Sequence, residues 1–277
     1  DQYQTYADQN NFRNNLNLSI GWDPDDLSFS FKKTWFWRFS GESNYDYFED
    51  GNYLDMAWLP RGPWGLFGVF HDYSRYYYDA SDTFRSRNYL DQSAGFSIQR
   101  EVNEQLSFKL EGGYNVRQFN RTSIQVNGPV TMTSPDFPLQ NDRTWSIRAI
   151  GHLYVESVLQ DFQLEHQRTD SNSYGFANTV DSISWAAILK PASSLYLQLF
   201  FRLYSKKYDT PPILGNPDLQ IGYVDEDSQD LLSIKTSWEW APQWSLNLGI
   251  SRFRTESAQP SLFYIKDIFS VELQKDF

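Results

Sequence analysis

The sequence predicts an all-β chain that folds as an antiparallel transmembrane β-barrel, and three observations predict it. Apolar and polar residues alternate with a period of two, the alternating runs are long, and the polar side of each run carries charged residues. No stretch shows a 3.6-residue period over three turns, so helices are not expected. The expected number of strands is fourteen, or twelve if one hairpin is misassigned.

The alternation itself is the first observation. In residues 106–116, Leu106, Phe108 and Leu110 alternate with serine, lysine and glutamate. A period of two places successive side chains on opposite faces of a strand. The same alternation runs through residues 27–40, 145–156, 195–204 and 232–240.

Length and charge then separate a membrane barrel from a soluble β-sandwich. The alternating runs reach roughly 10–14 residues, whereas strands in globular proteins usually have about 5–6 residues. A tilted strand needs about 9–11 residues to cross a bilayer. The charged face cannot lie in a dry core, so we expect it to face a wet interior while the apolar face meets lipid. An open edge in lipid would leave backbone groups unpaired, so the sheet is expected to close.

The connections between these runs alternate in length, as in barrels with short periplasmic turns and long outer loops. Tryptophans sit beside the short turns and predict an interfacial aromatic girdle; they are Trp22, Trp64, Trp240 and Trp244. Short turns are expected at residues 23–26, 60–63, 101–104, 157–161, 191–194 and 241–243, and long loops at 41–52, 79–88, 118–142, 169–179, 205–229 and 256–264.

The last strand, residues 266–277, resembles the C-terminal strand of bacterial outer-membrane β-barrels. Such strands end on Phe preceded by alternating apolar residues, which the barrel-assembly machinery reads. Phe277, Leu273, Val271 and Phe269 fit that signal, and Lys275 departs from it. The resemblance covers the whole chain in architecture without identifying a particular family. It implies the outer membrane of a Gram-negative bacterium, with the lipid bilayer and the assembly machinery as partners.

The strand count does not determine which residues form the first strand. Six hairpins and a terminal strand make thirteen strands, whereas bacterial single-chain barrels have even counts. The fourteenth is expected from Gln2 to Asp8 or from sequence upstream. We expect residues 1–277 to form a single transmembrane barrel domain, either alone or as the membrane domain of a longer protein. The residues that follow Asp1 form neither the basic nor the apolar region of a signal peptide, so we expect that any signal peptide has been removed or that the chain is a piece of a longer protein.

Composition excludes several classes of protein. Aromatic residues make up 18% of the chain while the mean hydropathy is −0.60, so disorder is excluded. No apolar run of about 18 residues is present, which excludes a transmembrane helix. The net charge of −11 argues against nucleic acid as a partner. The chain has 0 cysteines, which excludes disulfides and thiolate chemistry.

Two patterns in the sequence resemble chemical sites but lack the residue spacing that those sites require. His166 is followed closely by Ser171 and Ser173, as in outer-membrane phospholipases, but the Asn-His-x-Ser-Asn-Gly arrangement of that family is missing. We therefore predict that the chain is not an enzyme. Acidic clusters at residues 49–55 and 225–230 lack the spacing of an EF-hand, so neither a metal nor a cofactor is predicted.

The expected barrel size and its polar interior predict the function, because a barrel of about fourteen strands encloses more space than its own side chains fill. Seven cations outnumber four carboxylates there, although mutual pairing inside a narrow barrel would also explain them. We predict an outer-membrane channel for small hydrophilic solutes, anions among them. The alternatives are an export barrel for a polysaccharide or protein, and a plugged structural barrel that binds a periplasmic or secreted partner subunit. The predicted lumen-lining residues are Lys32, Arg38, Lys109, Glu111, Arg117, Arg148, Glu165, Arg202, Lys235, Glu239 and Glu272.

Overall fold

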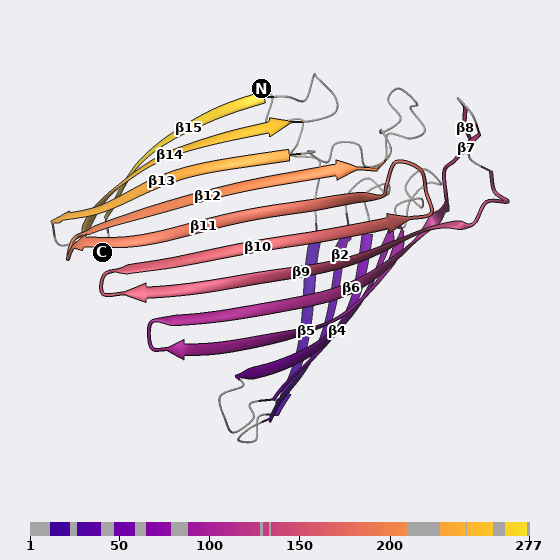
Figure 1. The fold of residues 1–277 in the computed structure, drawn as a ribbon, viewed down its shortest axis with the longest axis horizontal. Helices are drawn as coiled ribbons and strands as arrows, with labels where there is room; N and C mark the ends of the chain where they lie inside the picture. The colour runs from indigo at the N-terminus through magenta and orange to yellow at the C-terminus, as the bar shows by residue number, and fades with distance from the viewer. Residues whose placement is uncertain are drawn as a thin grey trace. The chain divides into compact units, whose positions relative to one another are not determined.

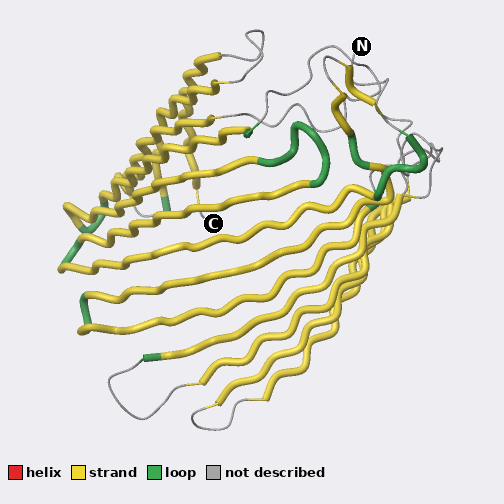
Figure 2. The backbone as a smooth tube through the Cα atoms, turned by 45° about the vertical axis from the view of Figure 1, so that its right-hand side comes forward, coloured by secondary structure: helices red, strands yellow, loops and turns green. Residues whose placement is uncertain are grey.

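The computed structural model describes residues 12–22, 27–39, 47–58, 65–78, 88–127, 130–132, 134–209, 228–241, 243–256 and 264–275. All regular secondary structure in these ranges is β-strand, joined by hairpins (Figures 1 and 2). Within the same ranges, no helix is long and apolar enough to cross a membrane.

Thirteen strands form one antiparallel sheet in chain order, and a separate two-stranded sheet pairs β7 with β8. The predicted all-β architecture is confirmed. The strands are β1 (Phe12–Trp22), β2 (Leu27–Phe39), β3 (Tyr47–Trp58), β4 (Leu66–Tyr78), β5 (Tyr89–Asn103), β6 (Leu106–Thr122), β7 (Gln125–Asn127), β8 (Val130–Met132), β9 (Leu139–Val155), β10 (Val158–Ser171), β11 (Asn178–Ala192), β12 (Leu195–Tyr208), β13 (Ser228–Ala241), β14 (Trp244–Glu256) and β15 (Tyr264–Lys275).

The thirteen strands counted directly in the sequence are the thirteen of the main sheet. The segment predicted to supply a fourteenth, residues 2–8, lies outside the described residues. Because neighbouring strands alternate in direction, the first and thirteenth strands of the sheet, β1 and β15, run in the same direction. Antiparallel pairing of these two ends would need one further strand between them.

The chain divides into two compact units, which are described separately. The first comprises residues 1–98, 112–145 and 169–177, and the second comprises residues 99–111, 146–168 and 178–277. In the first unit, Ile20 pairs with Phe31 and Phe31 pairs with Leu54 across β1, β2 and β3. Cross-strand partners share a face. This face, which we call the apolar face, also carries the exposed side chains of Leu16 and Leu18.

The second unit repeats this arrangement over four strands. Its apolar face carries the row Leu199, Ile234, Ile250 and Phe269 on β12 to β15. Ile234, Ile250 and Phe269 expose 41%, 53% and 73% of their surface, so this apolar row has no protein covering it among the described residues. The adjacent row on the opposite face, which we call the polar face, reads Gln198, Lys235, Gly249 and Ser270.

The terminal strand β15 carries its predicted apolar residues on the apolar face. Phe269, Val271 and Leu273 pair with Ile250, Leu248 and Leu246 of β14. Lys275 pairs with Trp244, and its ammonium lies 5.2 Å from the centre of the indole ring. Lys275, the residue that differs from the C-terminal signal of outer-membrane barrels, therefore makes a cation–π contact with an aromatic partner. Phe277 lies outside the described residues, and the role of this strand as an assembly signal stays a prediction.

Several predicted loops are shorter than expected because the strands continue through polar sequence. The predicted loop 41–52 was wrong at its end, since β3 begins at Tyr47. The predicted loop 118–142 was also too long. There β6 runs to Thr122, β9 begins at Leu139, and the segment between them contains the β7–β8 hairpin. The ladder is made by main-chain groups, so strands persist where the side chains become polar.

The short turns are tight, and one of them lies at a different position from the one predicted. The turn predicted at residues 101–104 lies instead at Glu104 and Gln105, because β5 continues to Asn103. The Asn103 side-chain oxygen accepts a 2.9 Å hydrogen bond from the Gln105 N–H, which favours the turn there. Glu156 and Gln243 adopt φ values of 48° and 69° in two other short turns. Left-handed backbone of this kind suits two-residue hairpins.

Arginine at Ile234 should destabilise the folded barrel by about 2–4 kcal/mol, because the side chain would enter lipid near mid-membrane. Ser237→Arg, on the polar face of the same strand, is the matched control and should change the free energy of unfolding by less than about 0.5 kcal/mol. Urea titration of both variants in lipid vesicles measures the difference. Equal losses would contradict the assignment of the two faces.

Candidate functional site on the polar face

The polar face is the candidate site, because it gathers most of the charged residues singled out in the sequence. The register places Lys32 of β2 beside Tyr53 and Lys235 of β13 beside Gln198, on the face opposite the apolar rows. Arg38 belongs to β2, and its side chain is outside the described set. Located on the polar phase of their strands, by register or by mutual contact, are Lys109, Glu111, Arg117, Arg148, Glu165, Arg202, Glu239 and Glu272. That they line a lumen stays a prediction.

In the second unit these charges pair with one another. Arg148 of β9 lies between Glu111 and Glu165, with nitrogen–oxygen distances of 3.4 Å and 3.2 Å. Lys109 contacts Glu111 at 2.7 Å. Cation and carboxylate therefore alternate around Arg148. Its Nε is buried without a hydrogen bond among the described atoms.

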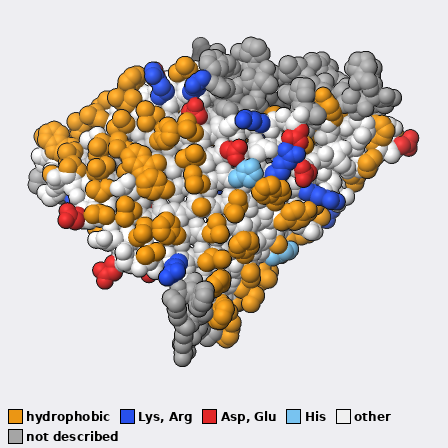
Figure 3. Space-filling model, viewed as in Figure 1, with side chains coloured by type: hydrophobic (Ala, Val, Ile, Leu, Met, Phe, Trp, Pro, Cys, Tyr) orange, Lys and Arg blue, Asp and Glu red, His pale blue; other side chains and the backbone are white. Residues whose placement is uncertain are grey.

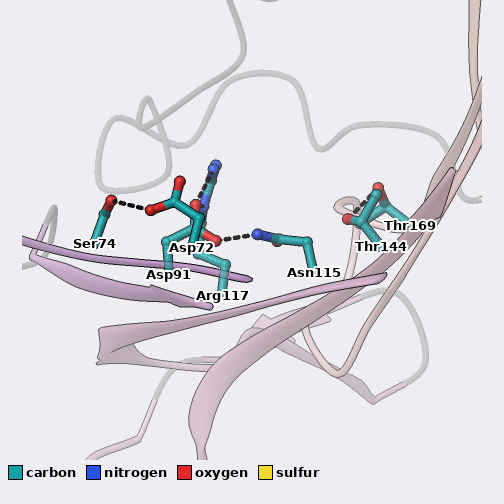
Figure 4. A network of polar contacts seen from close by, with 7 residues as sticks. All are labelled: Asp72, Ser74, Asp91, Asn115, Arg117, Thr144 and Thr169. Atoms are coloured by element: carbon teal, nitrogen blue, oxygen red, sulfur yellow. Dashed lines mark hydrogen bonds and ion pairs between the residues drawn. The ribbon is translucent and has the colours of Figure 1, made fainter. Parts of the chain in front are cut away.

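In the first unit, Arg117 is the centre of a second network (Figure 4). Its Nε and Nη2 donate to Oδ2 of Asp91 at 3.0 Å and 2.6 Å, and Asn115 donates to the other carboxylate oxygen. The guanidinium carbon lies 4.7 Å from the ring centre of Tyr89. Tyr89 stacks on Tyr76 with ring centres 4.4 Å apart. The carboxylate and the rings together hold Arg117 in one orientation.

A third group of polar side chains lies near the loop ends of the same unit. Asp142 accepts hydrogen bonds from Ser171 at 2.6 Å and from the Gln140 amide at 3.0 Å. Gln140 is fully buried and also accepts a hydrogen bond from Nε of Arg121. Beside this group, the hydroxyls of Thr144 and Thr169 lie 2.9 Å apart (Figure 4). Such satisfied polar networks rigidify the segment that they join.

Three carboxylates in these networks are absent from the residues predicted from the sequence: Asp72, Asp91 and Asp142. A signal was present for Asp91, which follows Tyr89 by two residues and so keeps the polar phase of β5. Asp72 holds the same phase in β4 and accepts a 3.5 Å hydrogen bond from Ser74 (Figure 4). Because of these carboxylates, the excess of cations on the polar face is smaller than the sequence analysis predicted.

Charged residues also interrupt the apolar face, and they are paired. Lys33 pairs with Asp50, His166 with Asp181 at 2.7 Å, and Arg252 with Asp267 at 2.7 Å. Arg168 binds Asp209 just beyond β12, and this hydrogen bond holds the pKa of Asp209 below its usual value. Figure 3 shows charged side chains gathering toward the loop ends of a largely hydrophobic face. Charge on a lipid-facing surface costs little only near the interface, so these pairs indicate where the strands leave the hydrocarbon.

The histidine and serine residues considered for catalysis are engaged separately. Ser171 donates to Asp142, and the hydroxyl of Ser173 accepts a hydrogen bond from the Ile124 N–H at 2.9 Å. His166 binds Asp181 through Nδ1. Of the other histidines, Nδ1 of His152 lies 2.5 Å from Asp161, and His71 faces Leu54 on the apolar face.

The acidic clusters weighed as metal sites are also placed in part. In β3, Glu49 and Asp50 are successive residues, so their side chains point to opposite faces. Residues 225–227 lie outside the described set. Within the described ranges, no group of three or more His, Asp or Glu side chains converges to hold a metal ion.

Comparisons with known proteins identify the fold. No family model and no curated protein matches the sequence. Among solved structures, the siderophore receptor PirA from Acinetobacter baumannii matches 96% of this chain at 10% identity, with a TM-score of 0.53. The ferric citrate transporter FecA matches 96% at 11% identity, with a TM-score of 0.52. The matches take in only 55% of PirA and 53% of FecA. The chain has the fold of a bacterial outer-membrane β-barrel, and the predicted location in that membrane's bilayer is confirmed.

The prediction that the chain is not an enzyme was wrong, because this fold is compatible with an enzymatic role. Outer-membrane barrels with enzymatic activity are among the matched structures. One is LpxR from Salmonella typhimurium, which matches 82% of this chain and 88% of its own length at 8% identity, with a TM-score of 0.32. That distance transfers no activity to this chain. The barrel architecture nevertheless accommodates enzymes, so it gives no ground for excluding catalysis.

Asp91→Asn should lower the free energy of unfolding by about 1 kcal/mol, because Arg117 would lose its charged acceptor while staying half-buried. The control is Asp136→Asn, an exposed loop position where a change below about 0.5 kcal/mol is expected. Chemical unfolding in detergent measures both. A loss at Asp91 no larger than at Asp136 would show that the Arg117 network does not stabilise the fold.

Proposed function

We propose that the protein is a channel that lets small hydrophilic solutes diffuse across the outer membrane. One observation carries the proposal: each unit has an exposed apolar face backed by a face of charged and hydrogen-bonding side chains. Side chains such as Arg148 and Glu165 require water or polar partners, so in a closed barrel they face the interior. Barrels of about fourteen strands enclose more space than their own side chains fill.

The pairing of charges refines which residues would select the solute. Arg117 and Arg148 are neutralised by neighbouring carboxylates. Arg202 instead donates to the neutral Gln229 amide, and Lys235 has no ion pair among the described residues. These two cations would contribute to a preference of the interior for anions.

The proposal is tested by conductance in planar lipid bilayers under a salt gradient. The reversal potential should indicate anion preference at 0.01 M salt, where the Debye length is about 30 Å, and the preference should fade toward 1 M, where it is about 3 Å. An absence of conductance would contradict the channel and favour the barrel plugged by a partner or by its loops. Passage of a polysaccharide or protein in the same membranes would favour the export barrel.

The double variant Arg202→Gln, Lys235→Gln should move the reversal potential toward cations at low salt, because it removes two polar-face cations that have no ion pair among the described residues. Lys190→Gln, whose ammonium lies over Tyr196 near a short turn, is the one-charge control for each of the two single variants and should change the reversal potential less than either. Circular dichroism establishes that all variants keep their β-structure. Identical reversal potentials for the double variant and the wild type would show that other groups set the selectivity.

A further inference from the structure

The polar face of the second unit contains a shallow hollow of about 280 Å³ across β12, β13 and β14. Three apolar side chains line it, Phe200, Leu231 and Phe253, together with Gln198, two serines and Lys235. Its volume is close to the lower end of the range for small-molecule sites. All of its lining residues belong to the same unit.

The register explains the shape of the hollow. Phe200, Ser233 and Ser251 are direct neighbours across the three strands, and the two serine hydroxyls lie 2.8 Å apart. In the next row, Lys235 pairs with Gly249, which has no side chain to cover the space beside it. A Cβ atom there would stand 3.7 Å from Cγ of Lys235 and only 2.4 Å from Oγ of Ser270. Glycine at position 249 therefore permits the close approach of the Ser270 side chain in the row that contains Lys235.

The apolar lining breaks the alternation of its strands. Phe200 lies beside Phe201, and Leu231 lies beside Leu232, so each pair puts one apolar side chain on each face. Phe253 pairs with Leu231 and completes the apolar wall. Three half-buried apolar side chains on a face otherwise rich in charge form a surface that an apolar group can cover.

The charges beside the hollow are positive. Lys235 lines it, and Arg202 pairs with Leu231 at its border. No carboxylate lines the hollow, and within the described residues Lys235 makes no ion pair. The hydroxyls of Ser233 and Ser251 add hydrogen-bonding groups in the row between Lys235 and the Leu231–Phe253 pair. A ligand that matches all three features has an anionic end and a compact apolar body.

We infer that this hollow binds a small organic anion, a carboxylate attached to a ring or short apolar chain. The carboxylate would meet Lys235 and the serine hydroxyls, and the apolar body would cover Phe200 and Phe253. The inference rests on the proposed function in one respect, because solutes reach the polar face through an open interior. It deepens that proposal by naming the solute class.

Benzoate is the probe, titrated calorimetrically into the full chain in detergent micelles, with empty micelles subtracted. Benzoate should bind saturably. Acetate, which lacks the apolar body, and benzyl alcohol, which lacks the charge, should each bind at least about tenfold more weakly. Benzoate binding no tighter than that of both analogues, or no saturable binding, would overturn the inference.

Variants locate the site. Lys235→Gln and Phe253→Ser should each weaken benzoate binding about tenfold or more, whereas Lys190→Gln, outside the hollow, should leave it unchanged. Unchanged binding in both hollow variants, with β-structure intact by circular dichroism, would place benzoate elsewhere and refute the site. Calorimetry needs no ion flow. Binding without conductance would therefore count against the channel alone, and conductance without binding would count against the hollow alone.

Discussion

The structure depends on one constraint, which is that every backbone N–H and C=O inside a bilayer must find a partner within the protein. The chain meets it by laying successive strands side by side, so that β11 and β12 pair from Asn178 and Tyr208 down to the turn. Because the main chain forms hydrogen-bonded β-strands, successive side chains alternate between the two faces of the sheet. The apolar rows and the charged networks both follow from that alternation.

The alternation of side chains between two faces gathers the charged residues on one face, and the charged networks reduce the repulsion between them. About half of the side chains point away from the lipid. Cations placed together on that face would repel one another. Carboxylates therefore lie among the arginines, with Glu111 and Glu165 beside Arg148 and Asp91 beside Arg117. Hydrogen bonds and ring stacking fix these pairs in place. Lys235 has no ion pair among the described residues, so its charge is available to interact with a solute.

The sequence predicts the strands well because a period of two is a local property. Leu199 and Ile234 could be assigned to the apolar face from alternation alone. What pairs with a charged residue depends instead on the register between strands, which no local pattern contains. Asp91 lies 26 residues from Arg117 in the sequence, so its role could not be read from spacing. The hollow was missed for the opposite reason, because the apolar pair Phe200–Phe201 looks like a flaw in the pattern rather than a feature on both faces.

The ion pairs on the apolar face act as a gauge of membrane thickness. In β14, the aromatic end of the strand begins at Trp244, and the first charge on that face is Arg252, eight residues later. At about 3.4 Å per residue this is ~27 Å along the strand, or about 20 Å of height for a strand tilted by about 40°. A thicker bilayer would bury Arg252 and Asp267 in hydrocarbon or would have to thin around them. Hydrophobic mismatch of this kind sorts proteins between membranes, so the spacing of a tryptophan and an arginine on one strand ties this chain to a thin bilayer.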